Sequence, residues 1–398
     1  MRLSDRIRSV APSATLAVDA LVRKARAEGV DVVGFGTGEP DFDTPEHIKE
    51  AARAALREGR TKYTPSAGTM ELRQAICADL ARRGLSYTPE EVIAATGAKQ
   101  VLYNAFQVLL NPGDEVLIPA PYWVSYVEMV RLAGGVAVIV PGAETDGFVP
   151  PAEALAERCG PRTRAVIVNS PSNPTGELWP RELLQAVGEL AVERDLVILS
   201  DEIYDRLVYD GVQPVSVAAL APEFRARTLV VNGVSKTYAM TGWRIGYGAG
   251  PAPLIQAMAS LQSHSTSNPN SIAQAAAVAA LTGPQEVVEA MRREFETRRN
   301  LMVEGLNRLP GVVCRRPPGA FYAFPNVQKL LGRKTGGETV TDSTSLARFL
   351  LEATRVAVVP GIAFGVEGYL RLSYATSRER IAEGLKRLGE ALTILDSA

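Results

Sequence analysis

The stretch GVSKTYAMTGWRIG, residues 233–246, contains the most informative pattern of this chain. An apolar run at 228–231 precedes it and a second one at 245–249 ends it, and both runs are typical of buried strands. Lys236 is therefore expected in a short loop between two strands, with Arg244 eight residues further on. The small residues around Lys236 favour a site at the mouth of this loop.

Lys236 and Arg244 together indicate what such a site binds. A lysine that has lost its proton attacks a carbonyl carbon and forms a Schiff base. An arginine stays charged, and its forked guanidinium suits a phosphate. An aldehyde and a phosphate in one molecule describe pyridoxal 5'-phosphate (PLP), which we predict as the cofactor.

Composition and charge exclude several other kinds of site. The 398 residues carry a formal net charge of -1, which gives no reason to expect nucleic acid or a membrane as a partner. Three cysteines (Cys77, Cys159 and Cys314) lie far apart without a CxxC pair, which argues against a disulfide framework or a zinc site. With only two histidines, His47 and His264, we expect no bound metal. We find no secretory signal and no apolar run of about 18 residues, and we expect a cytoplasmic protein.

Strands and helices alternate in the middle of the chain. Continuous apolar strands separated by helices predict an α/β fold with a mostly parallel central sheet, covered on both faces. The predicted strands are 92–96, 115–118, 136–140, 165–169, 196–200, 228–231 and 245–249, and the predicted helices are 16–27, 44–56, 70–83, 98–110, 124–132, 181–193, 254–261, 272–281 and 287–308. In such sheets the functional groups lie at the carboxyl ends of the strands.

After residue 310 the pattern changes, which predicts a smaller α+β domain. Short strands are expected near Val312 and at 321–324, 356–359 and 369–373, with helices at 345–353 and 378–395. The polar, Gly-rich stretch 334–344 is predicted to be a mobile loop. We expect an N-terminal arm and part of the small domain at 1–44, a large PLP-binding domain at 45–285 and the small C-terminal domain at 286–398.

The glycine run GFGTG at 34–38 resembles half of a dinucleotide fingerprint. That fingerprint requires a helix directly after the glycines, and Pro40 and Pro45 stand in its place. We therefore expect a turn at which the backbone approaches a ligand.

The predicted strand ends supply groups that fit the cofactor. The backbone N–H groups of Gly97, Ala98 and Lys99 open a helix, where a phosphate binds well, and Ser235 and Arg244 would complete this cup. The remaining candidates follow other strands. Trp123 either stacks on the pyridine ring or fills the core, and Asp201 would hold the pyridine nitrogen protonated. Tyr204 and Asn173 would bind the ring hydroxyl.

Arg371 is the polar residue of an apolar strand in the small domain. A charge in that position must either face solvent or be paired. An α-carboxylate of a substrate is one such partner.

The lysine stretch resembles, position by position, the cofactor-lysine signature of class I aminotransferases. Over nearly the whole chain the sequence resembles the fold-type I PLP enzymes of the bacterial aspartate aminotransferase branch. This resemblance implies that Arg371 and Gly38 hold the substrate α-carboxylate, and that Trp123 and Asn173 also contact the substrate. It implies that Tyr63 reaches the cofactor phosphate of the partner subunit in a homodimer.

The branch resemblance rests on Pro-Ser-Ala-Thr at 12–15 and on Lys99. It implies that Ser13, Thr15 and Lys99 recognise the side-chain carboxylate of aspartate or glutamate. Ser13 and Thr15 would point the same way on an extended segment, although one of them would also serve as a helix cap. Some relatives that also accept prephenate carry a lysine where this chain has Ala11, so prephenate activity is less expected.

The resemblance implies an enzyme, a PLP-dependent aspartate aminotransferase. It would move the amino group between L-aspartate or glutamate and a 2-oxo acid such as 2-oxoglutarate, with ping-pong kinetics. Lys236 would hold PLP as an internal aldimine and then shuttle the proton as general base and acid. Asp201 and Tyr204 would support this chemistry.

Several alternatives stay open. One is another fold-type I PLP enzyme, such as an aromatic or prephenate aminotransferase, a C–S β-lyase or an aminocyclopropane-forming synthase. A second is a regulator that keeps this fold as a sensor, for which too few residues precede Gly34 to form a DNA-binding domain. A third is a lysine aldolase without cofactor, which would be colourless.

Overall fold

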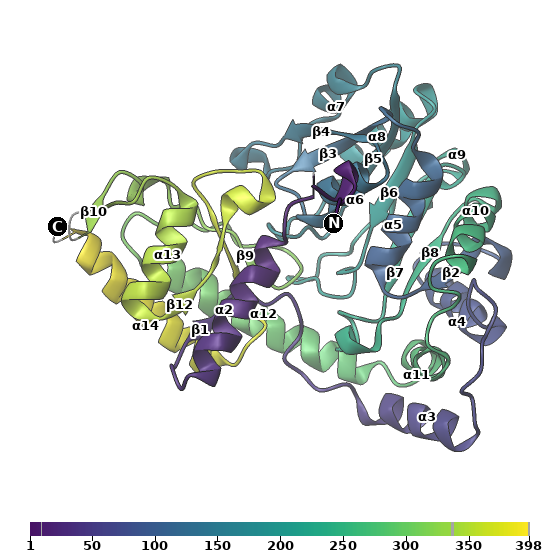
Figure 1. Ribbon diagram of the computed structural model, residues 1–398, viewed down its shortest axis with the longest axis horizontal. Coiled ribbons are helices and arrows are strands. Elements are labelled where there is room, and N and C mark those ends of the chain that lie inside the picture. The colour runs from purple at the N-terminus through teal and green to yellow at the C-terminus, as the bar shows by residue number, and fades with distance from the viewer. Residues whose placement is uncertain (9, 336–337, 397–398) are drawn as a thin grey trace.

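The computed structural model describes residues 1–8, 10–335 and 338–396 and has two lobes (Figure 1). The larger lobe contains a seven-stranded sheet in the order β2-β8-β7-β6-β5-β3-β4. Its strands are β2 Val92–Ala95, β3 Glu115–Ala120, β4 Val136–Pro141, β5 Thr163–Asn169, β6 Val197–Asp201, β7 Thr228–Gly233 and β8 Gly246–Ala249. Only β8 runs antiparallel to its neighbours, so the predicted mostly parallel sheet is confirmed.

Both faces of the sheet are covered, because successive strand residues point to opposite sides. In β6, Ile198 enters one apolar cluster and Leu199 enters another. The helices α7 Ala152–Arg158, α8 Arg181–Glu193 and α9 Pro222–Arg225 cover one face, and α5 Ala98–Leu109, α6 Ser125–Leu132 and α10 Ala252–Ser263 cover the other. The carboxyl ends of the parallel strands are left for the site.

A third apolar cluster lies at the β2–β8 edge of this sheet. The helices α3 Glu46–Arg57, α4 Met70–Ala81 and α11 Ser271–Thr282 form it together with β2 and β8. Two of these helices begin at side-chain caps, since Leu72 N donates to Thr69 Oγ1 over 3.3 Å and Ala273 N donates to Asn270 Oδ1 over 2.9 Å.

The smaller lobe combines an N-terminal and a C-terminal part of the chain, as Figure 1 shows by the purple helix α2 (Ala14–Ala27) and the yellow ribbons, whereas the N-terminus itself lies beside α6 of the larger lobe. Its strands are β1 Val33–Gly34, β9 Tyr322–Ala323, β10 Lys334–Thr335, β11 Glu338–Thr339, β12 Val356–Ala357, β13 Val359–Pro360 and β14 Leu370–Ser373. Its helices are α2 Ala14–Ala27, α13 Ser343–Thr354, α14 Arg378–Asp396 and the long α12 Glu286–Asn307, and the short α1 Asp5–Arg8 lies against α6. Because β1 pairs in parallel with β12, the segment before residue 44 packs with the C-terminal part of the chain.

Several details differ from the sequence predictions. The strand expected near Val312 is wrong, because the chain forms only a single bridge there, between Val313 and Asn326. The strand predicted at 356–359 is divided into β12 and β13, which belong to different sheets. The short α7 was not predicted.

The predicted loop 334–344 is also partly wrong. Within this stretch, Lys334–Thr335 and Glu338–Thr339 form the antiparallel hairpin of β10 and β11. Its last two residues already belong to α13, which Asp342 caps. Residues 336 and 337 of this stretch lie outside the described residues. None of the described helices is long and apolar enough to cross a membrane.

Candidate active site

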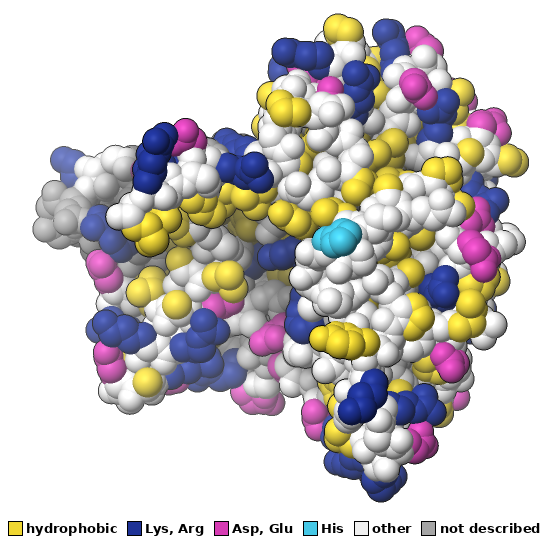
Figure 2. Space-filling model, turned by 45° about the vertical axis from the view of Figure 1, so that its right-hand side comes forward, with side chains coloured by type: hydrophobic (Ala, Val, Ile, Leu, Met, Phe, Trp, Pro, Cys, Tyr) yellow, Lys and Arg dark blue, Asp and Glu magenta, His cyan; other side chains and the backbone are white. Residues whose placement is uncertain are grey.

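A cavity of about 520 Å³ lies at the carboxyl ends of the central strands, and residues of both lobes line it. Figure 2 shows Lys and Arg side chains at the boundary between the two lobes. Twelve of the residues predicted from the sequence line this cavity, namely Thr15, Gly38, Ala98, Lys99, Trp123, Asn173, Asp201, Tyr204, Ser235, Lys236, Arg244 and Arg371. Residues separated by hundreds of positions thus meet at one place.

Lys236 lies in the loop between β7 and β8 and is half-buried. Its Nζ donates a hydrogen bond to the carbonyl of Gly38 over 2.5 Å, which ties the loop to the small lobe. Desolvation lowers the pKa of Lys236 to about 8, and the positive charges of Arg244 and Arg371 act in the same direction. About a tenth of this amine is therefore neutral and nucleophilic at pH 7, far more than for an ordinary lysine.

Asp201 is the last residue of β6, and 4% of its surface is exposed. The hydroxyl of Tyr126 donates to its Oδ2 over 2.7 Å, and the amide of Ile203 donates to its Oδ1 over 3.3 Å. Burial raises the pKa of Asp201 to about 6, and the Tyr126 hydrogen bond partly offsets this rise. Such a carboxylate gains from a cationic N–H partner.

The cup predicted to hold a phosphate lies where β2 turns into α5. Gly97 caps α5 with a φ of 87°, and a side chain at this position would collide with the guanidinium of Arg244. Arg244 donates to the carbonyl of Thr241 over 2.8 Å, and no carboxylate of the described residues forms an ion pair with it. The buried Ser235 completes the cup.

Trp123 has two kinds of neighbour. One edge contacts the ring of Tyr126, with 5.3 Å between the centroids, and another part of the indole lines the cavity. Lys99 Nζ lies 4.9 Å from the centroid of the indole. Trp123 therefore packs against the core and remains available to a planar ligand.

Arg371 in β14 is a buried cation with 2% of its surface exposed. Its Nη2 donates to the carbonyl of Gly36 over 2.6 Å and its Nη1 donates to Asn173 Oδ1 over 3.1 Å, whereas its buried Nε has no partner. No carboxylate among the described residues lies within ion-pair distance of it. A buried charge in this state would be stabilised by an anionic ligand.

Tyr204 is buried between the two lobes. Its hydroxyl lies 2.9 Å from that of Tyr322 in β9, and burial raises the pKa of both phenols. The hydroxyl of Tyr322 also abuts Gly38, because a Cβ at Gly38 would lie 3.0 Å from it. The cavity wall is therefore tightly packed at this point.

Three predicted residues do not line the cavity. Gly97 contributes to the cup through its backbone, and Ser13 lines a neighbouring cavity of about 690 Å³ that shares Lys99 and Arg244 with the first one. Tyr63 lies apart from both, on the surface, with 90% of its area exposed.

The extended segment expected for Ser13 and Thr15 is wrong. Thr15 belongs to the first turn of α2, and Ser13 caps this helix by accepting from Leu16 N over 3.5 Å. The two side chains still meet, because the cap geometry brings Ser13 Oγ within 3.0 Å of Thr15 Oγ1. The local hydrogen bonds of the cap therefore prevail over the extended form.

Several residues of the cavity were not predicted. Asp19 and Arg23 follow Thr15 at intervals of four residues on α2, and this helical spacing was a signal that would have found them. Tyr126 and Tyr322 were missed because their partners, Asp201 and Tyr204, are distant in the sequence.

Comparisons with known proteins show the family to which the chain belongs. The family model for aminotransferases of class I and II matches residues 30–388. An aspartate aminotransferase of Geobacillus stearothermophilus is 51% identical over 98% of both chains, and an aspartate/prephenate aminotransferase of Thermus thermophilus is 49% identical, also over 98% of both chains.

Solved structures give the same result. The crystal structure of the aspartate aminotransferase from Rhizobium meliloti superposes with a TM-score of 0.96 at 45% identity, covering 99% of this chain and 100% of that one. The fold is therefore that of the fold-type I PLP enzymes. The family match, the identities over nearly full length and the lysine-centred cavity lead to one conclusion, that the chain belongs to the class I and II aminotransferase family.

Proposed function

We propose that this enzyme transfers the amino group between L-aspartate or L-glutamate and a 2-oxo acid such as 2-oxoglutarate. The observation that carries the proposal is the buried guanidinium of Arg371, which pairs with no carboxylate in the described part of the chain and shares a cavity with the Lys236 amine. An amino acid brings both an α-carboxylate for the arginine and an amine that competes with the lysine.

The residues of the cavity fit PLP, the cofactor on which this family depends. Lys236 would hold its aldehyde carbon, Asp201 its pyridine nitrogen, and the cup of Gly97, Ala98, Lys99, Ser235 and Arg244 its phosphate. Trp123 would cover the ring face, and Asn173 and Tyr204 would bind the ring hydroxyl. When bound, PLP supplies the electron sink that makes the Cα proton of an amino acid acidic.

Each of the chain's own residues then has a defined task. Lys236, with its pKa near 8, removes the Cα proton and returns it as general base and acid. Arg371 with the backbone at Gly38 holds the α-carboxylate, and Lys99 with Thr15 and Ser13 would bind the side-chain carboxylate from the opposite side. Two carboxylates held at two points orient the Cα–H bond toward the lysine.

We further propose a cytoplasmic homodimer in which Tyr63 acts in the partner's site. The support is its position, since Tyr63 is 90% exposed and does not line the cavity of its own chain, which leaves it accessible to a second chain. We propose that 1–44 and 286–398 close as one body over 45–285 when a substrate binds, because Arg371 and Gly38 lie on the side of the smaller lobe.

A screen of half-reactions tests the proposal. Purified enzyme loaded with PLP is mixed with single amino acids, and the loss of the long-wavelength cofactor band is followed. L-aspartate and L-glutamate should convert the band at concentrations about 100-fold lower than L-alanine, because alanine lacks the second charged contact. Equal efficiency for alanine would contradict the dicarboxylate assignment, and pyruvate with ammonia from cysteine conjugates would identify a β-lyase instead.

Prephenate is a second candidate substrate, because relatives of 49–50% identity are named aspartate/prephenate aminotransferases. In this chain the backbone amide of Ala11 donates to Glu128 over 3.2 Å. The side chain of Ala11 is a methyl group and carries no positive charge that could bind a carboxylate of prephenate. The Ala11→Lys variant should therefore raise kcat/KM for prephenate while leaving that for aspartate within about twofold.

A further inference from the structure

Tyr322 has no task in the proposed reaction, yet it touches three parts of the site. It is a fully buried residue of β9, with 1% of its surface exposed. Its hydroxyl contacts that of Tyr204 and leaves no room for a Cβ at Gly38, and the guanidinium carbon of Arg371 lies 4.5 Å from the centroid of its ring. It therefore stands between the residue proposed to bind the substrate carboxylate and the residue proposed to bind the cofactor ring.

The hydrogen bond between the two phenols has only one useful direction. Each hydroxyl carries a single proton. If Tyr204 donates its proton to the ring hydroxyl of the cofactor, the 2.9 Å contact persists only with Tyr322 as the donor. A hydroxyl that accepts one hydrogen bond becomes a stronger donor in the next, so Tyr322 strengthens Tyr204.

Arg371 influences these two successive hydrogen bonds through the face of the Tyr322 ring. A cation over an aromatic face withdraws electron density from it, which makes the phenol a better donor. Other charged groups act on the two phenols, namely Asp19 on α2 and Asp201 at the end of β6, and Lys236 lines the same cavity. A substrate carboxylate that pairs with Arg371 would reduce this withdrawal.

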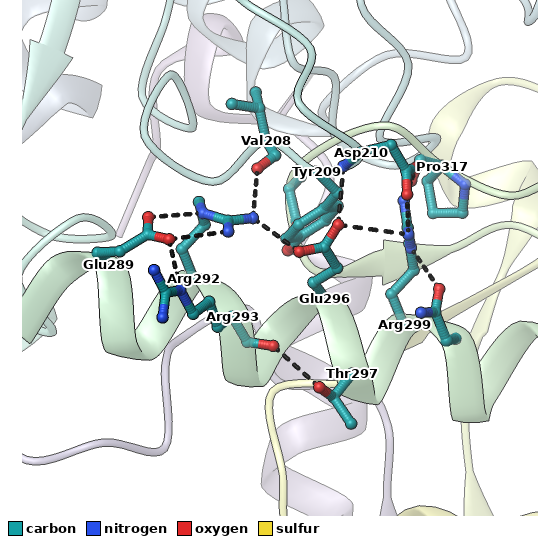
Figure 3. Close-up of polar contacts among 12 residues, drawn as sticks. Val208, Tyr209, Asp210, Glu289, Arg292, Arg293, Glu296, Thr297, Arg299 and Pro317 are labelled. Atoms are coloured by element: carbon teal, nitrogen blue, oxygen red, sulfur yellow. Dashed lines mark hydrogen bonds and ion pairs between the residues drawn. The ribbon is translucent and has the colours of Figure 1, made fainter.

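The surrounding backbone fixes the pair. Residues 207–209 run alongside 318–320, since Ala320 N donates to Leu207 O over 2.8 Å and Tyr209 N donates to Pro318 O over 3.0 Å. Figure 3 shows that α12 is bound to the residue after this segment, because Arg299 donates to both carboxylate oxygens of Asp210. The two distances are 2.6 and 2.8 Å. These contacts hold the segments that carry Tyr204 and Tyr322 side by side.

From these contacts, and resting on the proposed function, we propose that Tyr322 is a positioning residue that reports the binding of a carboxylate at Arg371 to Tyr204, and through Tyr204 to the ring oxygen of the cofactor. When Arg371 is paired, Tyr322 and then Tyr204 become weaker donors. The negative charge on the ring oxygen is then less stabilised, and the cofactor chromophore keeps its proton to higher pH.

Spectral titration of the loaded enzyme tests this relay, with maleate as a dicarboxylate that cannot react. In Tyr322→Phe, which keeps the ring, the pKa of the chromophore without maleate should rise by about 0.5 unit, the amount expected for the loss of one hydrogen bond. The further rise that maleate causes should be smaller than in the wild type. The dissociation constant of maleate should stay within about threefold, since the ring beneath Arg371 remains.

Two other variants separate the relay from a structural effect. Phe364 forms the other ring beside Arg371, 5.0 Å from its guanidinium carbon, and it has no hydroxyl toward Tyr204. Phe364→Leu should weaken maleate binding and leave the titration without maleate unchanged. In a Tyr204→Phe background, the further change Tyr322→Phe should not move the titration, because Tyr322 acts only through Tyr204.

Two results would overturn the relay. One is a Tyr322→Phe enzyme that titrates like the wild type with and without maleate, and the other is an additive effect in the Tyr204→Phe background. An enzyme without any cofactor band would instead refute the proposed function, so the two failures are distinguishable.

Discussion

Lys236 illustrates how a residue's surroundings change its chemistry. The same side chain on the surface would be a solvated ammonium, whereas here desolvation and the positive charges of Arg244 and Arg371 favour the neutral amine. Glu39, whose carboxylate accepts from Thr241 Oγ1 over 2.7 Å, acts in the opposite direction and limits the shift. The pKa of about 8 is the result of this balance.

This balance predicts how PLP loading depends on pH. The neutral amine attacks the aldehyde, and a lysine with a folded pKa of about 8 becomes neutral as the pH rises through that value. The rate at which cofactor-free protein gains the PLP absorbance band should therefore rise between pH 6.5 and pH 9, with a midpoint near 8. A midpoint near 10.5, the ordinary value for lysine, would contradict the lowered pKa.

Tyr126 is predicted to support Asp201. In Tyr126→Phe the carboxylate loses the hydrogen bond that most lowers its pKa, so its ionised form becomes less favourable. We expect the dissociation constant of PLP to rise about tenfold, as for one hydrogen bond to a charged group. Equilibrium dialysis against PLP measures it, with Tyr103→Phe on the exposed side of α5 as the control that should bind like the wild type.

At the scale of elements, α12 connects the two lobes through charged residues. Arg292 donates to the carbonyl of Val208 over 3.2 Å, Glu296 accepts from the amide of Asp210 over 2.7 Å, and Arg299 binds the Asp210 carboxylate (Figure 3). The Arg299 side chain is fully buried, while that of Asp210 is half exposed. The long helix is therefore attached to the segment that continues from Tyr204.

The charge of Asp210 should matter for stability. Asp210→Asn keeps the shape and tolerates the φ of 56°, but it removes the nearer carboxylate of the buried Arg299 and leaves it with Glu296 at 3.9 Å. The free energy of unfolding should fall by about 1–2 kcal/mol, less than for a fully buried pair because Asp210 is half exposed. Urea denaturation measures this, and Glu304→Gln, which breaks an exposed ion pair of the same helix, should cost less than about 0.5 kcal/mol.

The sequence predicted the features that depend on local pattern and missed those that depend on contacts between residues distant in the chain. The sheet was predicted because buried parallel strands are continuous apolar runs, and the groups at their ends, such as Asp201 and Lys236, follow from that topology. The sequence did not predict the hairpin of β10 and β11 or the single bridge at Val313. Short strands depend on tertiary partners more than on local pattern. The Tyr126–Asp201 and Tyr204–Tyr322 contacts span 75 and 118 residues, and no local signal encodes them.

At the scale of the whole molecule, Tyr63 makes the proposed dimer testable. A hybrid of a Tyr63→Phe chain and a Lys236→Ala chain contains one site with an intact lysine and an intact tyrosine from the partner. If Tyr63 acts across the interface, such hybrids should recover about half of the wild-type kcat per dimer, since one of two sites is complete. Hybrids that keep only the activity of Tyr63→Phe would show that each site uses its own tyrosine.

The most direct measurement is chemical labelling of the lysine. Borohydride reduces the bond between PLP and an amine to a stable one, and peptide mass spectrometry then locates the modified residue. We predict that the label lies on Lys236, and that Lys236→Ala has neither the label, the absorbance band nor turnover. A label on another lysine, or a Lys236→Ala enzyme that still transfers amino groups, would contradict the central claim.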